Sequence, residues 1–135
     1  MSRYLLDTNI LIAMSKGRSG LAERLAGIPA ETVLLSSVVV AEIEYGIAKS
    51  VRQEHNRRVF DVLLDGFAVV PFDHAAACFY GPIRAQLERV GRLIGPNDLM
   101  IAAHARALDA VVVTANVGEF TRVDGLRVEN WLDQR

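Results

Sequence analysis

Short apolar runs alternate along this chain with longer stretches in which apolar residues recur at helical spacing. Five apolar runs predict buried strands, at residues 4–6, 32–35, 67–70, 110–113 and, as an edge-like strand, 126–128. Helical spacing predicts helices at residues 10–14, 21–28, 37–49, 53–64, 74–90 and 99–108. Because strands and helices alternate throughout, the pattern predicts an α/β fold with a parallel, doubly wound sheet.

Polar residues at the ends of these runs predict where the helices begin. Thr8 or Asn9 is expected to cap the first helix, and Ser36 or Ser37 the helix that follows the second strand. Asp73 is expected to cap the helix after the third strand, and Pro96 suits the first position of the helix after that.

Length and composition predict one domain over residues 1–135 with more apolar surface than folding alone would cover. The chain is 51% hydrophobic, and its mean hydropathy is +0.22. We therefore expect a partner or a dimer to cover part of the surface. Charged residues interrupt every window near the roughly 18 apolar residues that a membrane span needs, so we expect a cytoplasmic protein. Cys78, the single cysteine, excludes an internal disulfide and is expected in the core.

The charge balance argues against a general nucleic-acid-binding protein. The net charge is -1 at pH 7, whereas proteins of that class usually carry a basic excess. Any nucleic acid would need a local basic patch, and the best candidates are Arg84, Arg89 and Arg92, around the second half of the helix predicted at residues 74–90.

Three carboxylates lie at the edges of apolar stretches, where a charge is costly unless it is paired or binds a metal. Asp7 directly follows the first predicted strand, and Asp98 lies two residues after Pro96. Each could simply stabilise the start of a helix. Glu42 is harder to explain in this way, because it lies beyond the first turn of its helix.

If the three acids meet at the carboxyl edge of the sheet, their repulsion requires a cation, and an all-oxygen cluster prefers Mg²⁺ or Mn²⁺. Other chemistries have less support. The three histidines lack metal-ligand spacing and are expected at the surface or in packing roles. The chain also has no phosphate-binding loop, dinucleotide fingerprint or nucleophile elbow.

Four motifs in one order resemble the PIN-domain ribonucleases, in particular the VapC-type toxins of type II toxin-antitoxin systems. They are the segment around Asp7, the stretch from Ser37 to Gly46 with Glu42 and Tyr45, the segment from Gly95 to Ala105 with Asp98, and the segment from Val113 to Trp131 with Asn116. The resemblance implies a single PIN-like domain with a parallel five-stranded sheet flanked by helices. It also implies that Asp7, Glu42 and Asp98 bind Mg²⁺, with Mn²⁺ as a substitute.

The resemblance departs at Asn116, where many family members carry a fourth acid. Asparagine can offer a neutral oxygen but no charge, so one well-held ion is expected. Glu119 could replace the missing acid in part, or could be a solvated turn residue. Thr8, Asn9, Thr114 and Asn116 are candidates for hydrogen bonds that hold the carboxylates.

The implied activity is hydrolysis of an RNA phosphodiester by metal-activated water. The implied partners are a cognate VapB-like antitoxin and a second copy of the chain, with a groove near residues 21–28 and 51–64. Two other hypotheses remain open from the residues: a PIN fold that binds RNA or protein without cleaving, and a Mg²⁺-dependent phosphohydrolase of the haloacid-dehalogenase type. The second is weakened because Asn9 stands where such enzymes usually place another Asp.

Overall fold

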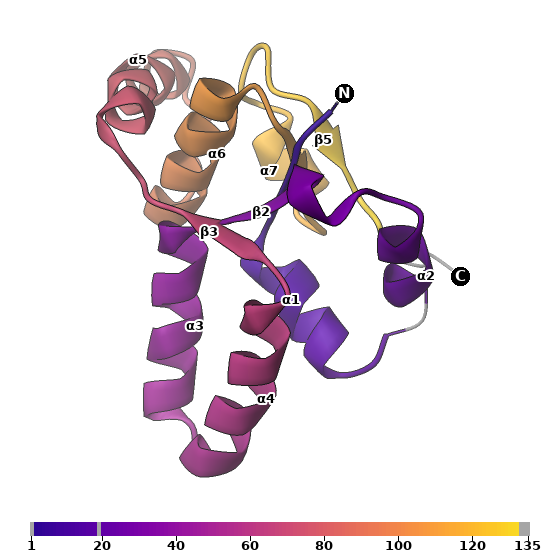
Figure 1. Ribbon diagram of the computed structural model, residues 1–135. Helices are drawn as coiled ribbons and strands as arrows, with labels where there is room; N and C mark the ends of the chain where they lie inside the picture. Colours follow the sequence, from indigo (N-terminus) through magenta and orange to yellow (C-terminus); the bar gives the residue numbers. More distant parts are fainter. Residues whose placement is uncertain (1, 19, 133–135) are drawn as a thin grey trace.

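A parallel sheet of five strands forms the centre of the computed structural model, which describes residues 2–18 and 20–132 (Figure 1). The strands are β1 (Tyr4–Leu6), β2 (Val33–Ser36), β3 (Ala68–Val70), β4 (Val111–Val113) and β5 (Val128–Glu129). Their order is β3-β2-β1-β4-β5, and each neighbouring pair is parallel. The predicted fold class and all five predicted strands are confirmed, with strand ends shifted by one or two residues.

Helices connect the strands, as the alternating pattern predicts. They are α1 (Thr8–Ser15), α2 (Leu21–Ala26), α3 (Ser37–Lys49), α4 (Gln53–Asp65), α5 (His74–Arg89), α6 (Pro96–Leu108) and α7 (Val117–Phe120), with a 3₁₀ turn at Ala30–Thr32. The sequence pattern did not predict α7 or the 3₁₀ turn, because neither is long enough to show a helical period. In Figure 1, α3 and α4 form a neighbouring pair and α5 lies beside α6.

The helix starts agree with the predicted caps at three positions and differ at one. Ser36 Oγ accepts a hydrogen bond from the Val38 amide at 3.1 Å, and Asp73 Oδ1 accepts one from the Ala76 amide, also at 3.1 Å. Pro96 is the first residue of α6. The cap expected at Thr8 or Asn9 was wrong, because Asp7 itself caps α1 and accepts from the Thr8 amide at 2.8 Å. The helix begins one residue earlier because this carboxylate already satisfies an unpaired amide.

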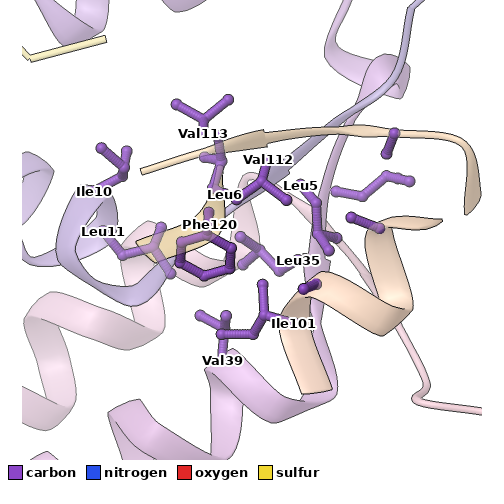
Figure 2. Packing of buried hydrophobic residues seen from close by; sticks show 14 of the residues in the cluster. Leu5, Leu6, Ile10, Leu11, Leu35, Val39, Ile101, Val112, Val113 and Phe120 are labelled. Atoms are coloured by element: carbon purple, nitrogen blue, oxygen red, sulfur yellow. The ribbon is translucent and has the colours of Figure 1, made fainter. Parts of the chain in front are cut away.

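The core forms where the central strands meet the helices. Leu5 and Leu6 of β1 and Leu35 of β2 have no exposed surface, and neither does Phe120 of α7 (Figure 2). β1 is the middle strand of the sheet, which explains why its sequence has no polar alternation. Burying these side chains holds the ends of β1 and β4 at fixed positions, and those ends carry the polar residues described next.

Two further findings concern the surface. None of the helices that the structure describes between residues 2 and 132 combines the length and hydropathy that a bilayer-spanning helix needs. Cys78 is exposed on α5, so its prediction as a core residue was wrong. The core face of this helix is formed by Ala76, Ile83 and Leu87 instead.

Candidate metal and nuclease site

The register of the central strands brings Asp7 and Thr114 together. Leu6, the last residue of β1, pairs with Val113, the last residue of β4, and the Asp7 amide donates to the Val113 carbonyl at 2.9 Å. Asp7 and Thr114, the residues that directly follow these two strands, therefore lie at the same carboxyl edge of the sheet. Ligands of open parallel sheets bind at this edge.

Asp7 is buried and hydrogen-bonded on both carboxylate oxygens. Only 3% of the residue is exposed. Its Oδ1 accepts from the Thr8 amide, while Oδ2 accepts from Thr114 Oγ1 at 2.8 Å and from Asn9 Nδ2 at 3.1 Å. Burial raises the pKa of Asp7, the three hydrogen bonds lower it, and the charge of Glu42 raises it again, with a net upward shift. All of these donors are neutral, so they orient the carboxylate without cancelling its charge.

Asn9 and Thr114 also join the Asp7 carboxylate to the loop after β4. Asn9 Nδ2 donates to Thr114 Oγ1 at 3.3 Å, and Asn9 Oδ1 accepts from the Ala115 amide at 3.0 Å. Thr114 Oγ1 accepts from the Asn116 amide at 2.9 Å. The two side chains thus fix the position of Asn116 relative to Asp7.

Glu42 approaches the same edge from α3. Its Oε1 accepts from Thr8 Oγ1 at 2.6 Å, and its Oε2 accepts from Asn97 Nδ2 at 3.2 Å. The side chain is half-buried, and its interior position in α3 agrees with the argument that capping does not explain it. Sequence reasoning missed the contact of Asn97, although its position directly before Asp98 in the first turn of α6 was a usable signal.

Asp98 and Glu119 are bridged by Asn116. Asn116 Nδ2 donates to Asp98 Oδ2 at 3.0 Å and to Glu119 Oε2 at 2.9 Å. Burial raises the pKa of Asp98 to about 6, followed by the charges of Asp7, Glu119 and Glu42, while the bond from Asn116 lowers it. Glu119 is therefore part of the acidic cluster, and its interpretation as a merely solvated turn residue does not fit these contacts.

We call Asp7, Glu42, Asp98 and Glu119 the acidic site. None of the four forms an ion pair among the described residues, where the salt bridges instead join Arg24, Arg57, Arg84 and Arg127 to other acids. Mutual repulsion without a cationic side chain is the electrostatic signature of a cation-binding site.

The donor chemistry of the acidic site fits a hard divalent cation, because every candidate ligand is an oxygen. Within the described residues, however, no three His, Cys, Asp or Glu side chains are placed to hold one metal ion as they stand. Asp7, Glu42 and Asp98 are instead linked through the hydrogen bonds of Thr8, Thr114 and Asn116. The acids are coupled electrostatically and are joined by neutral donors.

The three arginines named from the sequence lie on or just after α5. Arg84 binds Glu88 at 2.8 Å and the Tyr80 hydroxyl at 3.0 Å, and Arg89 donates to Gln86 at 2.6 Å. The Arg92 carbonyl accepts from Arg122 at 3.4 Å. In the described part of the chain, these hydrogen bonds do not join the arginines to the acidic site.

His104 lies in the interior and not in the acidic site. It is buried on α6, where its Nδ1 lies 2.8 Å from Ser36 Oγ and its ring packs edge-on against Phe72. Burial lowers its pKa, which favours the neutral ring. The packing role expected for a histidine is confirmed at this position.

Comparison with known proteins finds similarity along nearly the whole chain. A family model described as "PIN domain" matches residues 4–126. "Ribonuclease VapC2" of Rickettsia felis is 39% identical over 130 residues, covering 95% of this chain and 97% of that protein. "tRNA(fMet)-specific endonuclease VapC" of Shigella flexneri is 40% identical over 131 residues, covering 97% and 99%. The structure of VapBC2 from Rickettsia felis bound to a DNA fragment from their promoter contains a similar chain, with a TM-score of 0.90, 37% identity, and coverage of 95% and 98%.

Proposed function

This chain belongs to the PIN-domain family, and on that premise we propose that it is a Mg²⁺-dependent endoribonuclease and the toxin of a VapC-like toxin-antitoxin pair. The observation that carries the proposal is the acidic site: four carboxylates from distant parts of the chain interact at one edge of the sheet without a cationic partner among the described residues. Neutral donors orient Asp7 and Asp98, but no cationic side chain among the described residues offsets the charge of the four acids.

Asp7, Asp98 and Glu42 are the residues that would hold Mg²⁺, or Mn²⁺ in its place. When bound, the ion supplies positive charge at the scissile phosphate and makes water a better nucleophile at neutral pH. Thr8, Asn9 and Thr114 hold the carboxylates in position. Asn116 keeps Asp98 and Glu119 together with its amide group while adding no charge.

The substrate class that we propose is RNA, and initiator tRNA is the first RNA to test. The Shigella flexneri relative is named as specific for tRNA(fMet), whereas the name of the Rickettsia felis relative gives no particular RNA. Arg84, Arg89 and Arg92 are exposed and could contact phosphates beyond the site.

The proposed protein partner is a VapB-like antitoxin, together with a second copy of the chain. The Rickettsia felis structure contains such a toxin-antitoxin complex. Here, α4 has no fully buried residue, and its Val62 side chain is 78% exposed. A hollow of about 270 Å³ between α1, α2 and α4 is lined by Met14, Leu21 and Leu63. A partner would cover this surface. We propose that the protein acts in the cytoplasm, where both the antitoxin and RNA are present.

Cleavage of initiator tRNA in Mg²⁺ by single-residue variants tests the proposal. Glu42→Gln should lower the cleavage rate at least about a hundredfold, since it removes charge from the site. Glu44→Gln is the matched control, because Glu44 is on the same helix, is exposed and pairs with Arg57 instead. Wild-type protein should lose activity in EDTA and regain it with Mg²⁺ or Mn²⁺.

Calorimetric titration with Mg²⁺ separates the proposal from a non-cleaving PIN-fold binding module. Heat of binding in the wild type that is lost in Asp7→Asn supports the metal site. RNA binding that is insensitive to EDTA, with no metal binding and no cleavage, would contradict the nuclease proposal and favour the binding module.

A further inference from the structure

We propose that Tyr45 and Lys49 form a subsite for one unpaired RNA nucleotide next to the acidic site, with the base stacked on the Tyr45 ring and a phosphate near the Lys49 ammonium. This inference rests on the proposed nuclease function and identifies where its substrate lies on the protein.

A cleft of about 700 Å³ begins at the acidic site and continues along α3. It shares Glu42 with the acidic site, together with Thr8 and Asn97, which hydrogen-bond to this carboxylate. Tyr45, Lys49 and Met100 line it further along. At one end of the cleft, Glu42 accepts hydrogen bonds from both Thr8 and Asn97, which hold its carboxylate in place. An RNA strand that is cleaved at the acidic site can therefore continue into this cleft.

Tyr45 presents a large aromatic surface in this cleft. It is 66% exposed, although buried aromatic area is a major source of folding energy. Lys49 Nζ lies over one face of the ring, 4.8 Å from its centre, so a base would stack on the other face. Within the described residues, Lys49 takes no part in a salt bridge. Proteins bind single-stranded nucleic acids by combining exposed aromatic rings with cationic side chains.

Tyr45 lies next to Glu42 on the surface of α3. Residues three apart on a helix are surface neighbours, with Cβ atoms about 5–6 Å apart, and both side chains line the same cleft. An RNA strand that follows this cleft from Glu42 would therefore pass the Tyr45 ring.

A purely structural role explains less of the geometry. Tyr45 and Lys49 are four residues apart, and such pairs make only a small contribution to the stability of a helix. That contribution requires neither a ring in the wall of the cleft nor a cleft that continues from Glu42. A second copy of the chain could cover the Tyr45 ring in place of RNA, and the experiment below distinguishes these two alternatives.

The test measures KM and kcat in Mg²⁺ on initiator tRNA and on a short single-stranded RNA for Tyr45→Ala, Tyr45→Phe and Lys49→Gln. Stacking predicts that Tyr45→Ala raises KM about tenfold with a smaller change in kcat, and that Tyr45→Phe, which keeps the ring, behaves as wild type. Lys49→Gln should weaken binding and reduce its salt dependence. Val69→Ala, at an exposed position on β3, is the control.

Fluorescence anisotropy of the same RNA in an Asp98→Asn background tests the subsite without relying on cleavage. About tenfold weaker RNA binding after Tyr45→Ala, restored by Tyr45→Phe, supports the subsite even if the wild type cleaves no RNA, a result that would overturn only the proposed function. Unchanged binding and KM in Tyr45→Ala would overturn the subsite. So would dissociation of a dimer by Tyr45→Ala, seen by light scattering, because the ring would then lie between two copies.

Discussion

Replacing Asp98 by asparagine should stabilise the metal-free protein while removing its nuclease activity. Burial and the charges of Asp7, Glu119 and Glu42 raise the pKa of Asp98 from 3.8 to about 6. Because the folded protein then binds more protons than the unfolded chain between about pH 4 and about pH 6, the stability of the wild type falls as pH rises through this range. Asparagine cannot ionise, so the variant lacks this loss.

The size of the effect is limited by solvent. A pKa rise from 3.8 to about 6 would correspond to about 3 kcal/mol for a fully shielded group. Asp98 is only half-buried, and screening by water reduces the expected gain to about 1 kcal/mol above pH 6. Asparagine also keeps an oxygen that can accept the hydrogen bond from Asn116. The variant loses a favourable charge in the first turn of α6, worth about 0.5 kcal/mol.

Urea unfolding in EDTA at a series of pH values measures the difference, with the buried Trp131 as the fluorescent probe. The gain of the variant over the wild type should be near zero at pH 4 and reach its full value above about pH 6. Glu54→Gln, an exposed acid in the first turn of α4, is the control for the lost helix-dipole term. Mg²⁺ at a hundred times its Kd should stabilise the wild type by about 2.7 kcal/mol and the variant by much less.

Two results would refute this reasoning. A variant that is less stable than the wild type at pH 7 in EDTA would mean that Asp98 supports the fold and is not strained by its neighbours. A difference between the two proteins that does not change with pH would mean that the carboxylates are not coupled as their positions indicate. Cleavage activity in the variant would separately contradict its proposed role in holding Mg²⁺.

Three further predictions follow from individual contacts. Thr114→Val removes a hydrogen bond to the buried Asp7 carboxylate and should destabilise the protein by about 1–3 kcal/mol in urea unfolding, whereas Thr114→Ser, which keeps the hydroxyl, should destabilise it less. Asn116→Asp adds a charge beside Asp98 and should lower the metal-free Tm while raising Mg²⁺ affinity in calorimetry; unchanged affinity would place the ion elsewhere. Phe120→Ala empties the centre of the core and should cost about 3–5 kcal/mol in urea unfolding, and a loss under 1 kcal/mol would contradict its complete burial.

Local pattern was sufficient for the five strands and the six longer helices, and for part of the site. The apolar run at β1 has no alternation because the strand is covered on both faces, and this showed that Asp7 lies where a central strand ends. Glu42 was recognised because an acid in the interior of α3 has no local use. Both inferences depend only on residues close in sequence, and both positions are as the pattern predicts.

The errors and omissions have tertiary causes. Cys78 was expected in the core, but the face of α5 that packs inward is decided by α6, and Cys78 lies outside it. The cap of α1 was assigned to Thr8 or Asn9, whereas their side chains are used by Glu42 and Thr114 and leave the amide of Thr8 to Asp7. When a side chain has two possible hydrogen-bond partners, it bonds to the one that the fold brings near.

The amino-acid sequence by itself determined the order of strands and helices and the presence of acids at their edges, because strand and helix periods and helix starts are local properties. Only the tertiary structure decided which acids meet. Asp7 and Thr114 are 107 residues apart, and parallel pairing of β1 with β4 joins them. The Asn116 bridge between Asp98 and Glu119, and the link from Asn97 to Glu42, depend in the same way on strand order and helix packing, which no short stretch of sequence encodes.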